Sequence, residues 1–212
     1  MSTPIFIKSA ADPKDFPPDD GREVAFVGRS NSGKSTALNL LAGVRKLARV
    51  SKTPGRTQLV NFFAVGEGRR LVDLPGYGFA RVAPGTQERW RKVIEAYLTT
   101  RRSLAGVIVT IDIRRGIMEL DDTLLRWLER RSLRVGLLLT KADKLGHGAA
   151  VAREREIASL VAPGVELTRF SALNRTGVDV ARGWIDAWMQ ADADVAAGAQ
   201  TSPQPSKTMR QK

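Results

Sequence analysis

Eight consecutive residues near the start of the chain combine glycine, hydroxyl and lysine groups in a phosphate-binding pattern. They match the motif G-x-x-x-x-G-K-[ST] and comprise Gly28, Arg29, Ser30, Asn31, Ser32, Gly33, Lys34 and Ser35. Glycines let backbone N–H groups approach phosphate oxygens, and the N-terminus of a following helix adds positive potential. We therefore expect Lys34 to act catalytically by neutralising charge on the β and γ phosphates, and the Ser35 hydroxyl to bind Mg²⁺. The alternative is a glycine turn between a strand and a helix that binds no ligand.

A second group of residues could complete the magnesium and phosphate site. Asp73, Leu74, Pro75 and Gly76 follow an apolar run at a suitable distance downstream. A carboxylate at that strand end can hold the water shell of Mg²⁺, and the Gly76 N–H can donate to a γ-phosphate. Taken alone, these residues could equally form a turn after a strand.

Two further groups favour guanine over adenine as the base. The first comprises Thr140, Lys141, Ala142 and Asp143, and the second comprises Ser171, Ala172 and Leu173. The Asp143 carboxylate can accept hydrogen bonds from N1–H and the exocyclic amine of guanine, a donor pair that adenine lacks. The Lys141 stem would lie over the base, and a backbone N–H of the second group would donate to the guanine carbonyl. Each group follows a predicted strand, at the edge where open α/β sheets bind ligands.

The elements that must position these residues alternate along the chain. The patterns predict strands over 24–27, 58–65, 70–74, 106–113, 135–140 and 166–170, and helices over 34–43, 86–100, 119–131, 148–161 and 177–190. The runs at 106–113 and 135–140 are continuously apolar, as in strands covered on both faces. The sequence therefore predicts an α/β P-loop domain over residues 21–190. Its sheet should have about six strands, mostly parallel with one antiparallel edge strand, and helices on both faces.

Both ends of the chain differ in composition from this domain. Residues 1–20 contain four prolines and four aspartates, which predict an irregular N-terminal arm. Residues 191–212 have few large apolar groups, which predicts a disordered tail.

The composition excludes several kinds of chemistry. The 212 residues include no cysteine and one histidine, His147, so disulfides, thiol catalysis and Cys- or His-cluster metal sites are excluded. The chain shows no signal-peptide pattern and no apolar run of the ~20 residues that span a membrane, so we expect a cytoplasmic protein. The formal net charge is +12. Residues 191–212 hold two aspartates and three basic residues, a net +1, so +11 lies in residues 1–190 and favours an anionic partner, nucleic acid before membrane.

On these motifs the chain resembles the EngB (YihA/YsxC) ribosome-biogenesis GTPases of bacteria, within the translation-factor-like GTPases. The resemblance covers about residues 5–190 and is most specific in four segments: GRSNSGKS from Gly28, SKTPGRTQLVNFF from Ser51, DLPGYGF from Asp73 and LTKADKL from Leu139. It implies binding of GTP and GDP, GTP hydrolysis and Mg²⁺. It also implies a role in assembling the large ribosomal subunit or its precursor, contact with ribosomal RNA, and a requirement for normal cell division and septation.

The segment 44–57 carries five basic residues and no acidic residue. Because like charges repel in a packed loop, we expect it to be mobile until an anion orders it, as in a GTPase switch. Thr57 is the preferred second Mg²⁺ ligand, since it matches the family's G-x-T threonine, and Thr53 is the alternative. The nucleotide-contacting residues would then be Gly55, Arg56, Thr57, Gln58 and Leu59. A solvated basic loop is the other interpretation.

Two positions bear on the rate of hydrolysis. Tyr77 stands where Ras-like GTPases carry a water-orienting glutamine, so unassisted hydrolysis should be slow. Asn31 stands where related GTPases use an asparagine to help hold K⁺ against the phosphates. An asparagine that tolerates left-handed backbone geometry would explain the same residue without K⁺.

Other signals are weaker. Arginine pairs at 69–70, 101–102, 114–115 and 130–131 are expected to be solvated, with some sharing a face that meets RNA phosphate. Trp184 and Trp188 should lie on the core face of the last helix. A P-loop small-molecule or nucleoside kinase, and an RNA-binding module with a structural nucleotide, are the alternative functions. A membrane-surface GTPase would need an amphipathic or lipidated segment, and none is evident.

Overall fold

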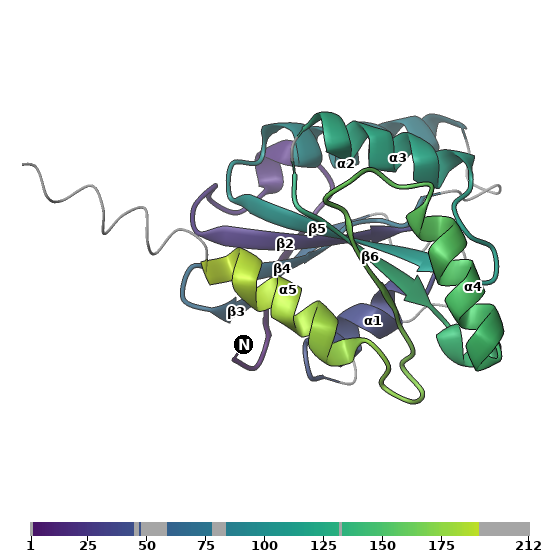
Figure 1. Cartoon of the computed structure of the whole chain (residues 1–212). Coiled ribbons are helices and arrows are strands. Elements are labelled where there is room, and N and C mark those ends of the chain that lie inside the picture. The colour runs from purple at the N-terminus through teal and green to yellow at the C-terminus, as the bar shows by residue number, and fades with distance from the viewer. Residues whose placement is uncertain (1, 45–46, 48–58, 78–83, 132, 191–212) are drawn as a thin grey trace, which may run out of the picture.

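The chain folds into a twisted sheet with helices on both faces (Figure 1). The computed structural model describes residues 2–44, 47, 59–77, 84–131 and 133–190, with only the backbone over 84–91. The strands in this part of the chain are β1 (Ile5–Ala10), β2 (Arg22–Gly28), β3 (Val60–Gly66), β4 (Arg69–Asp73), β5 (Leu104–Asp112), β6 (Val135–Thr140) and β7 (Glu166–Arg169). Their order in the sheet is β1-β3-β4-β2-β5-β6-β7. Strands β4, β2, β5, β6 and β7 run parallel, and β3 runs antiparallel to both of its neighbours.

Helices cover the sheet in two layers. The helices are α1 (Lys34–Leu41), α2 (Pro84–Thr100), α3 (Glu119–Arg130), α4 (His147–Ala158) and α5 (Val178–Gln190), with short 3-10 turns at Pro13–Asp15 and Ala142–Lys144. Helices α1 and α5 pack on one face, and α2, α3 and α4 pack on the other (Figure 1). The predicted α/β fold is therefore confirmed, and the predicted helices and strands agree with the observed ones to within three residues at each end.

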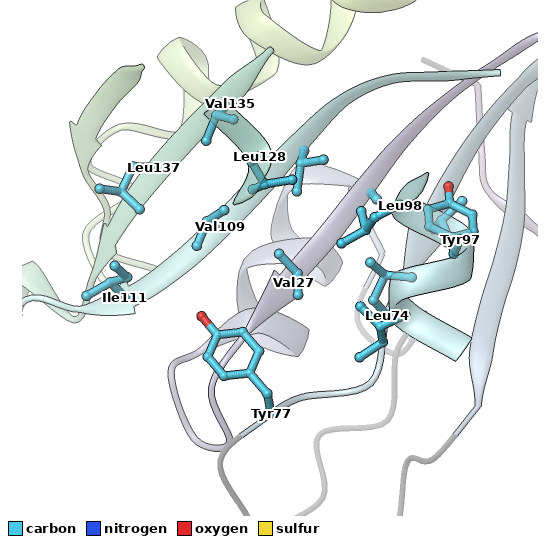
Figure 2. Close-up of a cluster of buried hydrophobic side chains, with 14 of the residues drawn as sticks. Val27, Leu74, Tyr77, Tyr97, Leu98, Val109, Ile111, Leu128, Val135 and Leu137 are labelled. Carbon is cyan, nitrogen blue, oxygen red and sulfur yellow. The ribbon is translucent and has the colours of Figure 1, made fainter. Parts of the chain in front are cut away.

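The central strands carry apolar residues at consecutive positions because both of their faces are buried. In β2, Ala25 and Val27 point to the α2, α3 and α4 layer, whereas Val24 and Phe26 point to α1 and α5. Figure 2 shows buried hydrophobic side chains on the α2, α3 and α4 side of the sheet, where side chains of the strands meet those of α2 and α3. Such a strand cannot show the alternation of a half-exposed one.

Helix α5 packs closely on the sheet because two strand residues are glycines. Trp184 and Trp188 stack with ring centroids 6.5 Å apart. A Cβ atom at Gly106 would lie 2.2 Å from the Trp188 ring, and one at Gly136 would lie 2.7 Å from the Trp184 ring. The tryptophan pair therefore belongs to the core, as its spacing predicts.

The N-terminal segment is more regular than its composition indicates. Residues 5–10 form β1, which pairs with β3 at the sheet edge, so the expectation of an irregular arm is wrong there. As a result the sheet has one strand more than the predicted six, and β1 lies beyond the antiparallel β3. Prolines and aspartates gave no sign of this pairing, because the partner strand lies over 50 residues away in sequence. The predicted tail at 191–212 lies outside the described residues.

Residues 17–23 are anchored by a buried ionic cluster at the end of the sheet where β2 begins. Glu23 is fully buried and accepts hydrogen bonds from Arg70 (2.7 Å), Tyr97 (2.7 Å) and Arg101 (2.6 Å). Arg101 also donates to the carbonyl oxygens of residues 17 and 18. Burial alone would lower the pKa of Arg101, but the hydrogen bonds and charge of Glu23 outweigh it and raise that pKa. The prediction that Arg70 and Arg101 are solvated is therefore wrong, because both neutralise the buried Glu23 carboxylate.

Candidate nucleotide site

The motif residues within the described part of the chain gather at the carboxyl edge of the parallel strands. The phosphate loop follows β2, Asp73 ends β4, Thr140 ends β6 and Ser171 follows β7. Since neighbouring parallel strands end at the same edge, these segments converge although they span almost 150 residues of sequence. This is the edge at which doubly wound sheets bind ligands.

The phosphate loop has a backbone that only particular residues can form. A Cβ atom at Gly28 would lie 2.1 Å from Thr110 Oγ1, so no larger residue fits there. Gly33 has φ 93°, and Asn31 has φ 65°, in the left-handed region that asparagine tolerates better than most residues. The Ser32 hydroxyl lies 2.7 Å from Thr110 Oγ1 on β5 and holds the loop against the sheet. Residues 29–33 therefore wrap closely over the strand ends before α1 begins at Lys34.

Lys34, the first residue of α1, pairs with Asp73 at the end of β4. Both side chains are almost fully buried, at 9% and 2% exposed, and they form a direct ion pair. Ser35 follows in the first turn of α1 and is partly buried. The Lys34 ammonium group and the Asp73 carboxylate therefore meet at the carboxyl ends of the strands, and Ser35 is the next residue of the helix.

The segment after β4 is tied to the phosphate loop by backbone hydrogen bonds. The Leu74 N–H donates to the Phe26 carbonyl at 3.0 Å and the Tyr77 N–H to the Gly28 carbonyl at 3.2 Å. In return, the Ser30 N–H donates to the Tyr77 carbonyl at 2.9 Å. Pro75 and Gly76 lie between these anchors, and Gly76 approaches the loop so closely that a Cβ there would be 3.3 Å from the Gly28 carbonyl oxygen.

The Tyr77 side chain points into the core and not toward open solvent (Figure 2). It is 8% exposed, and its hydroxyl donates to Asp121 Oδ1 at 2.7 Å. The other Asp121 oxygen accepts from the Met118 N–H at the start of α3. Burial, with a further contribution from the Asp121 charge, raises the pKa of Tyr77. This neutral, engaged side chain is unsuited to orienting a water molecule.

The segment after β6 is held to both the phosphate loop and β5. Thr140 Oγ1 donates to the Ser32 carbonyl. Lys141 has φ 59°, and its ammonium group donates to the Asn31 carbonyl at 2.7 Å and to Asp112 Oδ2 at 2.9 Å. Burial alone would raise the pKa of Asp112, but hydrogen bonds from Arg114 and Lys141 outweigh it and lower that pKa.

Asp143 and the segment after β7 meet directly. The Ser171 hydroxyl donates to Asp143 Oδ1 at 2.7 Å, and the Ala142 N–H donates to the Phe170 carbonyl at 3.2 Å. The Ser171 hydrogen bond is the main cause that lowers the pKa of Asp143. Ser171 is buried, whereas Ala172 and Leu173 are exposed. The two groups predicted to read a base therefore form one unit with an ionised carboxylate.

Some predicted residues cannot be placed in this arrangement. Gly55, Arg56, Thr57 and Gln58 lie outside the described residues, as do Thr53 and most of the basic segment 44–57. Leu59 is described, exposed, and immediately precedes β3. His147 is exposed and is the first residue of α4.

Sequence reasoning missed three residues that support the site: Thr110, Asp112 and Asp121. Thr110 and Asp112 lie near the C-terminal end of β5, and a signal was present, because polar residues are unusual in an otherwise apolar run. Asp121 gave no such signal, since acidic residues are common in the first turn of a helix. Its role depends on Tyr77, which is 44 residues away.

Known proteins resemble this chain in sequence and in fold. A family model described as "50S ribosome-binding GTPase" matches residues 23–141, more than half of the chain. A protein of Enterobacter sp. (strain 638) named "Probable GTP-binding protein EngB" is 49% identical over 186 residues, covering 86% of this chain and 89% of that protein. A protein of the same name from Coxiella burnetii is 45% identical over 190 residues, covering 88% and 93%.

Solved structures show the same fold. The crystal structure of a probable GTP-binding protein engB aligns with a TM-score of 0.65 and 21% identity, covering 80% of this chain and 99% of that one. The structure of Era with MgGDPNP and a segment of 16S ribosomal RNA aligns with a TM-score of 0.63 and 21% identity, covering 79% and 56%. At this identity the structures support the fold alone, whereas the family model and the sequence relatives establish membership. The chain belongs to the EngB family of GTP-binding proteins, within the P-loop GTPases.

Proposed function

We propose that this protein is a GTP-dependent switch that acts in assembly of the large ribosomal subunit and is needed for normal cell division and septation. The observation that carries the proposal is the match of residues 23–141 to a model of 50S ribosome-binding GTPases, over the segment that holds the phosphate loop and Asp73. The expected partner is the large subunit or its precursor, contacted through ribosomal RNA in the cytoplasm. No helix in the part of the chain that the structure describes is long and apolar enough to cross a membrane.

The residues at the carboxyl edge fit GTP and Mg²⁺. The ion prefers oxygen ligands, and in nucleotide sites one or two protein groups and the phosphates complete its coordination. Ser35 and Asp73 offer a hydroxyl and a carboxylate at the same point of the edge, with Thr57 as the proposed second direct ligand and Asp73 as the holder of the water shell. Bound there, the ion would neutralise charge that develops on the β and γ phosphates.

The nucleotide would be held from three directions. Backbone N–H groups of Arg29–Ser35 and the start of α1 would surround the phosphates, with Lys34 exchanging Asp73 for phosphate oxygens. The Gly76 N–H would donate a hydrogen bond to the γ-phosphate, and residues 55–59 would contact the nucleotide. Asp143 would accept from the guanine edge, Lys141 would lie along the base, and the segment 171–173 would donate to the guanine carbonyl.

Hydrolysis without a partner should be slow. Tyr77 is buried and bound to Asp121, so it cannot position the attacking water as a glutamine would. Among the described residues near the loop, the carboxylates are engaged: Asp73 pairs with Lys34, and Asp112 pairs with Arg114 and Lys141. We infer that the ribosomal particle, or a factor on it, accelerates the reaction.

Asn31 is the proposed K⁺-holding residue. Its left-handed backbone gives a second reason for an asparagine, so the two explanations need a functional test. If Asn31 helps hold K⁺, GTP hydrolysis will be faster in potassium than in sodium, and Asn31→Gly will remove the difference while retaining the backbone geometry. Equal wild-type rates in the two salts would restrict Asn31 to shaping the loop.

The partner can be tested by sedimentation. The protein, loaded with a non-hydrolysable GTP analogue, is centrifuged through sucrose with purified large or small ribosomal subunits. We expect it to sediment with large subunits and to stay at the top of the gradient with small subunits. Equal sedimentation with both would indicate a general RNA-binding protein.

A further inference from the structure

The Lys141 side chain is held in place by hydrogen bonds to two neighbouring residues. It is long, 32% exposed, and belongs to a residue with left-handed backbone. Fixing such a side chain loses considerable rotamer entropy, which its contacts must offset. One contact is the Asn31 carbonyl on the phosphate loop and the other is Asp112 on β5.

Asp112 is built to hold a cation in a fixed place. It pairs in register with Thr140 of β6, which puts its carboxylate beside the residue that follows. The side chain is 5% exposed. Arg114 Nε donates to Oδ1 at 2.9 Å and Arg114 Nη2 to Oδ2 at 2.7 Å, a two-pronged geometry that fixes the plane of the carboxylate.

The loop that carries Arg114 is itself clamped from α4. Arg153 donates to the carbonyl oxygens of Ile113 at 3.2 Å and Arg115 at 3.0 Å. Gly116 has φ 71°, a left-handed backbone that favours glycine, and a Cβ there would lie 2.4 Å from Arg153 Nη2. The Asp112 carboxylate therefore lies on a strand end, and its partner Arg114 lies on a loop that Arg153 holds through two hydrogen bonds.

We infer that Asp112 is a positioning residue for nucleotide affinity that acts through Lys141. By holding the ammonium group against the phosphate loop, it keeps the Lys141 stem extended along the place proposed for the base. It also joins the base-reading segment to the phosphate loop, so that the two halves of the site keep their spacing. This inference rests on the proposed guanine site and assigns Asp112 no contact with the nucleotide.

A double-mutant cycle tests this coupling. Dissociation constants and off-rates for GDP and GTP are measured for wild type, Asp112→Asn, Lys141→Ala and the double variant. A lost hydrogen bond to a charged group should weaken binding by about tenfold in Asp112→Asn. Lys141→Ala should weaken binding at least as much, and adding Asp112→Asn to it should change affinity less than twofold. Because Asp112 acts on binding, kcat at saturating GTP should stay within twofold of wild type while KM rises.

Asp122→Asn is the matched control. It removes one carboxylate from a partly exposed pair with Arg126 on α3 and should leave nucleotide affinity unchanged. Wild-type affinity of Asp112→Asn, or fully additive losses in the double variant, would overturn the inference. Equal wild-type affinity for GDP and ADP would instead overturn the base-site assignment, and this inference with it.

Discussion

At the residue scale, the site depends on a few polar groups whose state is fixed by their neighbours. Asp143 accepts from Ser171, which keeps its pKa lowered, so the carboxylate is ionised throughout the physiological pH range. Lys34 and Asp73 are charged groups that are buried together. Replacing Asp143 should therefore change which base is bound, whereas replacing Lys34 should change both nucleotide binding and stability.

Replacing Asp143 should change which base is bound. Asp143→Asn presents an amide, which pairs better with the extra carbonyl of xanthine than with the amine of guanine. The mispaired polar group should cost about 1–3 kcal/mol in GTP binding, while affinity for xanthosine triphosphate rises. Competition titrations with both nucleotides measure the exchange, and unchanged GTP affinity would show that Asp143 does not read the base.

Removing Lys34 should reduce both nucleotide binding and stability, and a second substitution should restore only the stability. In Lys34→Ala the buried Asp73 carboxylate loses its cation, so the free energy of unfolding should fall by about 3 kcal/mol along with the loss of GTP binding. Adding Asp73→Asn should restore most of the stability but none of the binding. Urea denaturation and nucleotide titration of both variants provide the check. Recovery of GTP binding in the double variant would exclude a ligand role for Lys34.

At the element scale, local motifs predicted which strand ends carry the candidate residues, because each motif is a short stretch whose chemistry shows in its own residues. The phosphate loop, Asp73 and the segment around Asp143 all follow predicted strands and meet as expected. Contacts between residues far apart in the sequence could not be predicted from such short motifs. Arg70 and Arg101 look like solvated pairs until Glu23 is placed between them, and Ile5–Ala10 looks irregular until β3 provides its partner.

The anchoring of residues 17–23 has a pH signature at Asp19. Asp19 accepts from the Arg102 and Ser103 N–H groups and from the Ser103 hydroxyl. Burial alone would raise the pKa of Asp19, but these hydrogen bonds and Arg101 outweigh it and lower the pKa to about 2. Because the folded pKa lies below the ordinary aspartate pKa of 3.8, ionised Asp19 stabilises the fold above about pH 4. That contribution should be lost as the pH falls toward 2.

The difference in unfolding free energy between wild type and Asp19→Asn measures this contribution. It should be about 2 kcal/mol at pH 7 and shrink toward zero between pH 4 and pH 2. Asp122→Asn, which removes a partly exposed carboxylate, should show a difference of less than about 1 kcal/mol at every pH. A pH-independent difference for Asp19→Asn would mean that packing, and not charge, accounts for the effect.

At the scale of the whole molecule, the nucleotide site lies at the carboxyl ends of the parallel strands. The Glu23 cluster lies at the opposite end of the sheet, where β2 begins. Residues 74–77 follow Asp73 at the nucleotide site. The segment 44–57, the predicted first switch, carries five basic residues and no acidic residue, so a nucleotide that orders it would also present its charge to RNA. A partner can distinguish the GTP form from the GDP form only if it binds the two with different free energies.

Higher salt should weaken RNA binding, and it should weaken binding of the GTP form more steeply. With +11 on residues 1–190, binding to ribosomal RNA should lean on phosphate contacts. Affinity should then fall with salt with a log–log slope of about −0.7 to −0.9 for each phosphate neutralised. If the basic switch segment contributes contacts only when ordered, the slope should be steeper for the GTP form.

The most direct test of the account is the affinity for purified large ribosomal subunits, measured with a GTP analogue and with GDP at several salt concentrations. We expect the GTP-analogue form to bind at least about tenfold more tightly, which corresponds to roughly 1.4 kcal/mol of coupling between nucleotide and particle. Equal affinity of the two forms at every salt concentration would contradict a switch and leave a GTP-binding protein with a different partner.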